Sequence, residues 1–142
     1  MKDINLHLTG KVIAIKHAIP LLKKSQTPRI INIASRLGTK PMTDSVGYCC
    51  AEAAVIMLTK VAALELALYG IRVNTVSPAL TDTPFARRSY TKDEFANFAK
   101  KNPLSRIGKT TDVANVIKFL LSTEAEYING ENINVSGGIL LV

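Results

Sequence analysis

Residues 47–78, GYCCAEAAVIMLTKVAALELALYGIRVNTVSP, decide the fold class of this chain. The part from Gly47 to Tyr69 is apolar on nearly every side, which predicts a long helix that is covered on more than one face. Gly70 follows as a left-handed helix cap. Ile71–Val76 is then a short β-rich run that ends before Pro78. A buried helix joined directly to a buried strand is typical of a layered α/β protein.

The rest of the chain continues the alternation of helices and strands. Apolar residues recur at helical spacing within residues 4–24, and Thr91 with Glu94 forms a capping box for another helix. We therefore expect helices over 4–24, 47–69, 92–101 and 113–122, strands over 29–34, 71–76 and 131–135, and loops over 36–46 and 79–90. These four helices and about three strands predict a parallel α/β sheet within a single domain, 1–142.

Composition excludes several classes of protein. The chain has 142 residues, of which 47% are apolar and 20% charged, and this balance excludes a disordered chain. The longest apolar stretch is interrupted by Glu52, Lys60 and Glu65, so we expect no membrane partner. The formal net charge is +7, but the basic residues are scattered without interleaved aromatics, so we expect no nucleic-acid partner.

The two cysteines are neighbours, Cys49 and Cys50. A pair so close in sequence cannot link distant segments, and its spacing does not suit a metal site. We expect no bound metal and two small thiols in a reducing, cytoplasmic compartment.

Several motifs combine into a known pattern. Ser35 follows the first predicted strand, and Tyr48 lies thirteen residues later at the start of the long helix. The second strand leads into SPALTDTP at 77–84, and the chain ends with INGENINVSGG at 128–138, preceded by PLSRIG at 103–108. Together these motifs resemble the short-chain dehydrogenase/reductase family, most closely its ketoacyl reductase group. The resemblance covers essentially all of the chain.

The resemblance implies a partial Rossmann-like, doubly wound sheet and the C-terminal, catalytic and substrate-binding half of such an enzyme. The expected reaction is NAD- or NADP-dependent interconversion of a small carbonyl compound and an alcohol. A carbonyl being reduced needs a proton donor and a hydrogen bond at its oxygen. By resemblance, Tyr48 is the acid or base, Ser35 orients the substrate oxygen and Asn5 holds a relay water. The predicted nicotinamide contacts are Tyr48, Pro78, Thr81 and Thr83.

Two features depart from the family pattern. The family has Lys four residues after the tyrosine, where this chain has Glu52. A carboxylate can accept hydrogen bonds from ribose hydroxyls, but its charge has the wrong sign for lowering the pKa of Tyr48. The glycine-rich turn that holds the cofactor diphosphate is also missing from the 142 residues. We therefore expect that the nucleotide-binding half is absent and that the chain alone binds NAD or NADP weakly.

Three interpretations remain open at this stage. The first is a truncated member of the oxidoreductase family. The second is a non-catalytic pseudoenzyme or oligomerisation module, which pairs with itself or with a full-length relative through the helices at 4–24 and 47–69. The third is a degenerate reading frame. The apolar helices favour a homo-oligomer under either of the first two interpretations.

Overall fold

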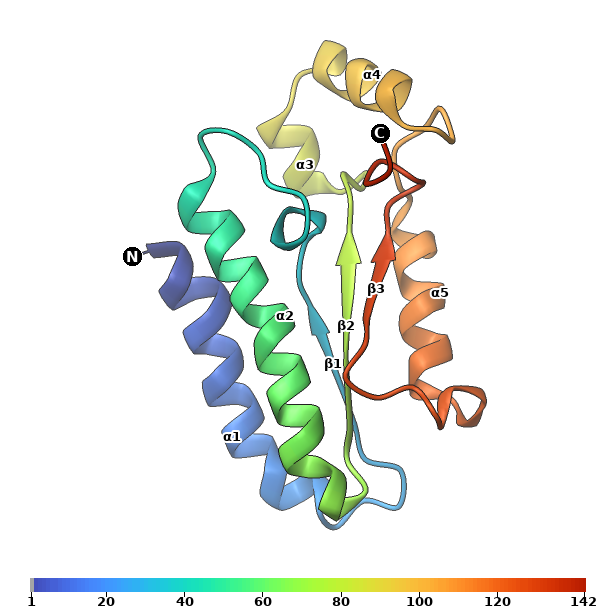
Figure 1. Ribbon diagram of the computed structural model, residues 1–142. Helices are drawn as coiled ribbons and strands as arrows, with labels where there is room; N and C mark the ends of the chain where they lie inside the picture. Colours follow the sequence, from blue (N-terminus) through green and yellow to red (C-terminus); the bar gives the residue numbers. More distant parts are fainter. Residues whose placement is uncertain (1) are drawn as a thin grey trace.

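The computed structural model describes residues 2–142 and shows a parallel sheet between helical layers (Figure 1). The strands are β1 (Arg29–Ile33), β2 (Arg72–Pro78) and β3 (Asn132–Val135). The helices are α1 (Gly10–Leu22), α2 (Val46–Leu66), α3 (Pro84–Ser89), α4 (Lys92–Lys101) and α5 (Thr110–Leu121). A π-helical segment, η1 (Ile4–Thr9), leads into α1, and 3₁₀ turns form η2 (Arg36–Gly38), η3 (Ala67–Tyr69) and η4 (Thr123–Ala125).

The sheet has the order β1-β2-β3, with both neighbouring pairs parallel. Asn32 of β1 lies opposite Thr75 of β2, and Val76 of β2 lies opposite Ile133 of β3. Beyond the end of β1, the Ala34 amide still donates to the Val76 carbonyl at 2.9 Å. Because all three strands run in one direction, their carboxyl ends meet at one edge of the sheet. The segments α3 and α4 lie beyond that edge (Figure 1).

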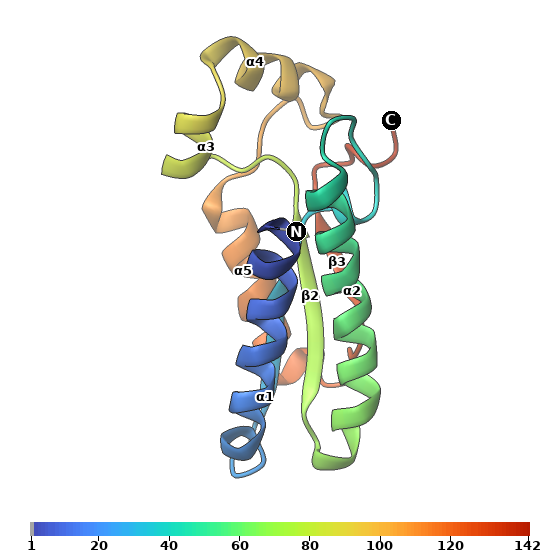
Figure 2. The same cartoon turned by 90° about the vertical axis from the view of Figure 1, so that its left-hand side faces the viewer.

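Alternating side chains along the strands build a core on each face of the sheet. On one face, Ile30 and Val73 pack with Ala62, Ala63 and Leu66 of α2 and with apolar residues of α1. Figure 2 shows α1 and α2 running side by side over this face. On the other face, α5 packs against a second core, whose members are Ile31, Val76, Val113, Val116, Ile117, Leu120, Ala125, Ile128, Ile133 and Val135. The layers therefore confirm the doubly wound α/β fold.

A buried polar cluster joins α2 to the first two strands. The Thr59 hydroxyl accepts from Asn32 Nδ2 at 2.8 Å and from Thr75 Oγ1 at 2.6 Å, and it donates to the Val55 carbonyl at 3.0 Å. One hydroxyl thus uses its single donor and both acceptor positions. The cluster holds the helix that carries Tyr48 in register with the strand that leads to Ser35.

The main correction to the expected elements concerns residues 79–90, which we expected to form an irregular loop. The structure places α3 there, so residues 2–142 contain five α-helices where the pattern predicted four. Thr83 is the N-cap, its side chain accepts from the Ala86 amide at 3.1 Å, and Pro84 occupies the first turn. The predicted capping box of Thr91 and Glu94 is confirmed at the start of α4. In residues 2–142, none of the helices combines the length and apolar character that a bilayer span requires.

Candidate active site

The carboxyl edge of the sheet carries a cavity of about 860 Å³. Ser35 reaches it from the end of β1, Tyr48 from the first turn of α2, and Pro78 from the end of β2. Thr81 and Thr83 line the same cavity from the segment between β2 and α3. The structure thus brings together five of the predicted site residues.

Ser35 is held by the turn that follows β1. It is buried and is the N-cap of η2, and its hydroxyl oxygen accepts from the Leu37 amide at 3.2 Å. The turn lies against α2 because Gly38 has no side chain. A Cβ atom at Gly38 would stand 2.8 Å from the Glu52 carbonyl carbon and 2.9 Å from the Ala53 nitrogen. This close approach sets how Ser35 stands relative to the start of α2.

Tyr48 lies beside Ser35, and its environment favours the neutral phenol. Burial raises the pKa of Tyr48 above its usual value, and the negative charge of Glu52 raises it further. A hydrogen bond with the Ser35 side chain acts in the opposite direction and lowers this pKa in part. The net direction is upward, so Tyr48 keeps its proton at neutral pH and is suited to donate it.

Glu52 is buried beneath the cavity rather than being one of its lining residues. Its side chain is only 2% exposed, and Oε1 lies 2.9 Å from Nδ1 of His7. The other oxygen, Oε2, is buried without a hydrogen-bond partner among the described residues. Burial raises the pKa of the Glu52 carboxyl, while the charges of His7 and Lys11 lower it in part. Glu52 thus pairs with the N-terminal helix and is not among the residues that line the cavity.

The two threonines of the predicted nicotinamide contact already have local partners. The Thr81 hydroxyl donates to the Ala79 carbonyl at 3.0 Å, and the Thr83 hydroxyl oxygen caps α3. Backbone bonds between Asp82 and Gly108 at 2.8 Å, and between Gly108 and Leu80 at 2.9 Å, fix this segment. The geometry keeps Thr81 and Thr83 at the cavity wall, with part of their hydrogen-bonding capacity used by the backbone.

The sequence comparison reports a match of residues 1–140 to the family model described as enoyl-(acyl carrier protein) reductase. The chain belongs to the short-chain dehydrogenase/reductase family. Among curated proteins it is 37% identical over 137 residues to the 2,5-dichloro-2,5-cyclohexadiene-1,4-diol dehydrogenase LinX of Sphingobium indicum, covering 96% of this chain and 54% of LinX. It is 36% identical over 141 residues to the 3-oxoacyl-[acyl-carrier-protein] reductase FabG of Rickettsia felis, covering 99% and 58% of the two chains.

Solved structures support the same assignment to the short-chain dehydrogenase/reductase family. A short-chain type dehydrogenase/reductase from Mycobacterium ulcerans matches with a TM-score of 0.90 and 30% identity, covering 97% of this chain and 50% of that one. ElxO with NADP bound matches with a TM-score of 0.86 and 30% identity, covering 96% and 56%. This short-chain dehydrogenase/reductase chain spans about half the length of the curated relatives it matches.

Asn5 is not brought to the cavity of this short-chain dehydrogenase/reductase. It is exposed, whereas His7, two residues further on, lines the cavity and stacks edge-on against Tyr48 with ring centroids 5.0 Å apart. Sequence reasoning missed His7 because Asn5 lies in the π-helical η1, where the Gly10 amide bonds to the Asn5 carbonyl five residues back. This wider turn changes which positions face α2, and a 3.6-residue period cannot predict it.

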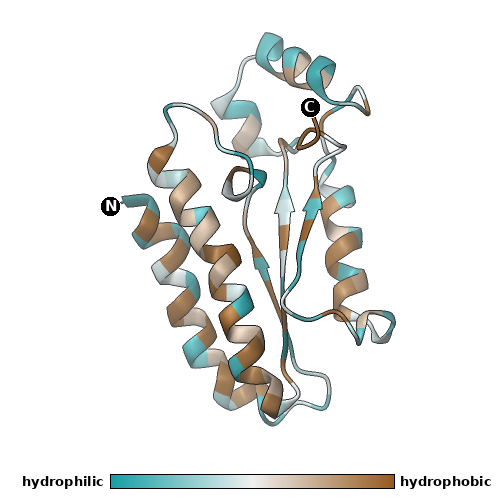
Figure 3. Ribbon diagram, viewed as in Figure 1, coloured by the Kyte–Doolittle hydropathy of each residue, from teal (hydrophilic) through white to brown (hydrophobic). Residues whose placement is uncertain are grey.

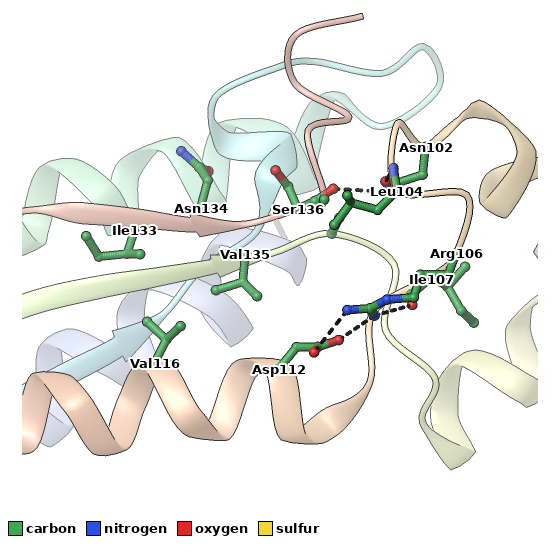
Figure 4. Close-up of a pocket in the computed structure, with 13 residues that line it drawn as sticks. Asn102, Leu104, Arg106, Ile107, Asp112, Val116, Ile133, Asn134, Val135 and Ser136 are labelled. Atoms are coloured by element: carbon green, nitrogen blue, oxygen red, sulfur yellow. Dashed lines mark hydrogen bonds and ion pairs between the residues drawn. The ribbon is translucent and has the colours of Figure 1, made fainter.

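A second cavity, of about 290 Å³, lies at the end of β3 and contains none of the predicted site residues (Figure 4). Arg106 and Asp112 form an ion pair of 2.7 Å at its wall, and Asn102 donates to the Ser136 carbonyl at 2.9 Å. The ion pair ties the segment before α5 to the first turn of α5, and the Asn102 bond ties the end of α4 to the turn after β3. The Asn102, Arg106 and Asp112 side chains are therefore engaged within the cavity wall.

Proposed function

We propose that this chain carries the proton-transfer site of an NAD(P)-dependent oxidoreductase that interconverts a carbonyl compound and an alcohol. The observation that carries the proposal is that Tyr48 and Ser35 line one cavity together with Pro78, Thr81 and Thr83. A half-buried phenol beside a buried serine hydroxyl is suited to bind and protonate one oxygen atom. Family membership and the NADP bound to the neighbouring ElxO structure support a nicotinamide cofactor.

The residues present fit the nicotinamide end of such a cofactor. A volume of about 860 Å³ lies in the range of small-molecule sites, and Tyr48, Thr81 and Thr83 place polar atoms at the wall. When bound, the reduced nicotinamide supplies the hydride. Since the sequence has no glycine-rich turn for the diphosphate, we propose that the chain alone binds NAD or NADP weakly.

The chain's own residues supply the proton and the orientation. Ser35 donates a hydrogen bond to the carbonyl oxygen and holds it near the phenol. Tyr48 gives its proton to the same oxygen as the carbon becomes an alcohol carbon, and it takes the proton back in the oxidation direction. The raised pKa of Tyr48 keeps the phenol protonated at neutral pH, so this site is better prepared for reduction than for oxidation.

The substrate end of the cavity is largely apolar. Its lining includes Leu37, Met42, Phe85, Phe98 and Ile117. Tyr90 also lines it and packs edge-on against Phe98, with ring centroids 5.7 Å apart. We propose a small carbonyl or alcohol with an apolar portion, because such walls gain from covering apolar surface.

The direct test is carbonyl-dependent oxidation of NADH or NADPH by the 142-residue chain at millimolar cofactor, with a β-keto ester as the carbonyl. We expect Tyr48→Phe to abolish the rate and Ser35→Ala to reduce it. Tyr127→Phe is the matched control, because Tyr127 is fully exposed and is not among the residues that line the cavity. A wild-type chain without carbonyl-dependent oxidation, or a Tyr48→Phe rate equal to that of Tyr127→Phe, would refute the proposal.

We further propose that the chain self-associates through α1 and α2. Figure 3 shows hydrophobic residues along both helices. Several large apolar side chains of these helices are exposed, namely Ile13, Leu21, Met57 and Leu64. Leu64 is 80% exposed, so Leu64→Glu should convert an oligomer to a monomer in sedimentation velocity without unfolding it. A wild-type monomer at micromolar concentration would contradict this proposal.

We also propose that the protein resides in a reducing compartment, the cytoplasm. Cys49 and Cys50 are both free thiols. A reducing compartment such as the cytoplasm is compatible with that state.

A further inference from the structure

His7 and Glu52 form a pair next to Tyr48 that the proton transfer described above does not use. The His7 side chain is 27% exposed and lines the cavity, while Glu52 is buried below it. The His7 ring stands at 85° to the Tyr48 ring, with centroids 5.0 Å apart. The partly exposed imidazole thus contacts both the buried carboxylate and the aromatic ring of Tyr48.

The contact with Glu52 decides which imidazole nitrogen is available. Because Nδ1 of His7 lies 2.9 Å from Glu52 Oε1, Nδ1 is the nitrogen that carries a proton toward the carboxylate. In neutral imidazole the other nitrogen, Nε2, is then a proton acceptor. A carboxylate that holds one ring nitrogen also fixes the ring orientation.

The charged groups around the pair come from two elements and one turn. From η1 and its flanks, Asp3 lines the cavity and Lys11 Nζ donates to the His7 carbonyl at 3.0 Å. From α2, Tyr48 and Glu52 face His7, and Cys49 follows Tyr48 in the chain. From η2, Arg36 lines the cavity. Among these groups, Glu52 is the one in direct contact with a ring nitrogen of His7.

We propose that His7, held by Glu52, is a second proton-transfer residue of the cavity, which returns a proton to Tyr48 after each donation. The inference rests on the proposed function. In the reduction direction the Tyr48 O–H bond breaks and its proton goes to the alcohol oxygen. The resulting phenolate takes a proton from Nε2 of the His7 imidazolium, directly or through one water. Neutral His7 keeps its Nδ1 proton toward Glu52 and regains the Nε2 proton from solvent, so His7 undergoes no redox change.

The first test concerns the pairing alone and needs no turnover. Nitrogen-15 shifts of labelled histidine in the 142-residue chain report the tautomer, and His17→Gln assigns the His7 signals. At alkaline pH we expect the Nδ1–H tautomer of His7. Glu52→Met removes the acceptor at similar volume and should shift His7 toward Nε2–H. An Nε2–H tautomer in the wild-type chain overturns the pairing even if Glu52→Met fails to fold.

The second test concerns the proton transfer. His7→Gln should lower kcat by about 10²- to 10⁴-fold, the range that acid–base catalysis provides, with little change in KM. His17→Gln is the matched control, since His17 is an exposed residue of α1. Added imidazole should restore part of the rate of His7→Ala, which a merely structural role for His7 would not allow. Equal kcat values for His7→Gln and His17→Gln overturn the proton transfer.

The two failures can be told apart. A wild-type chain without carbonyl turnover refutes the proposed function, and with it the proton transfer from His7. The Nδ1–H tautomer would in that case still establish the His7–Glu52 pairing. Normal wild-type turnover combined with an Nε2–H tautomer leaves the proposed function standing and refutes the inference about His7.

Discussion

Replacing Thr59 with valine should destabilise the fold through the polar cluster that joins α2 to the strands. Valine keeps nearly the same volume, so the change removes a hydroxyl rather than making a cavity. It leaves Asn32 Nδ2 and Thr75 Oγ1 without the acceptor that they now reach at 2.8 and 2.6 Å. Thr59 is 1% exposed and Thr75 is 0% exposed, so water does not readily replace that acceptor.

The expected cost follows from these two orphaned donors. A buried donor left unsatisfied costs about 1–3 kcal/mol, so the two together cost about 2–6 kcal/mol of unfolding free energy. With a urea slope of about 2 kcal/mol/M, the unfolding midpoint should fall by about 1–3 M. The measurement is urea unfolding followed by circular dichroism.

Thr59→Ser provides the matched control. Serine keeps the hydroxyl and loses one methyl group, which corresponds to about 1 kcal/mol of buried apolar surface. We expect the serine variant to be clearly more stable than the valine variant. If the valine variant is as stable as the serine variant, the cluster does not contribute to stability and the reasoning is refuted.

Three further predictions concern Asp112, Glu52 and Gly38. The Arg106 side chain and the Lys109 amide lower the pKa of Asp112 to about 2, so the contribution of Asp112 to stability is present above pH 4 and is lost as pH falls from about 4 to 2. Asp112→Asn should make the unfolding free energy fall less steeply in that pH window. An unchanged dependence of the unfolding free energy on pH would contradict the ion pair. Glu52→Gln should lower the pKa of Tyr48, because it removes a negative charge that raises it, and phenolate absorbance compared with Tyr48→Phe measures the shift. Gly38→Ala should lower the free energy of unfolding by about 1–3 kcal/mol and lower carbonyl turnover, since the new Cβ would stand 2.8 Å from the α2 backbone. Thermal unfolding and the NADH assay measure the two effects, and a stable, fully active variant would refute the role of that contact.

The position of Glu52 also bears on how this site could be engineered. Lysine at this position would place an ammonium group where a carboxylate, 2% exposed, now contacts His7. Burying an ammonium group in place of the carboxylate that contacts His7 is unfavourable, so restoring the family's lysine alone should destabilise the N-terminal end of the fold. A change at Glu52 therefore needs a matching change at His7.

Much of the fold could be predicted from sequence because its signals are local. The long apolar run in 47–69 predicts a helix covered on two sides, and α2 does pack on both the sheet and η1. The three strands are short β-rich runs bounded by proline or glycine, and each appears within one or two residues of its predicted limits. The helix α3 was missed because six residues give little periodicity, and its signal is the Thr83–Pro84 cap alone.

The sequence motifs, through their resemblance to the short-chain dehydrogenase/reductase family, predicted that Ser35, Tyr48 and Pro78 share one site, and all three line the cavity. Only the tertiary structure decided which residue of the N-terminal helix reaches that site. The π-helical turn of η1 leaves Asn5 exposed and brings His7 against Glu52 and Tyr48. A contact of this kind depends on how two helices separated by more than twenty residues are rotated against each other, and no local pattern in the sequence encodes that rotation.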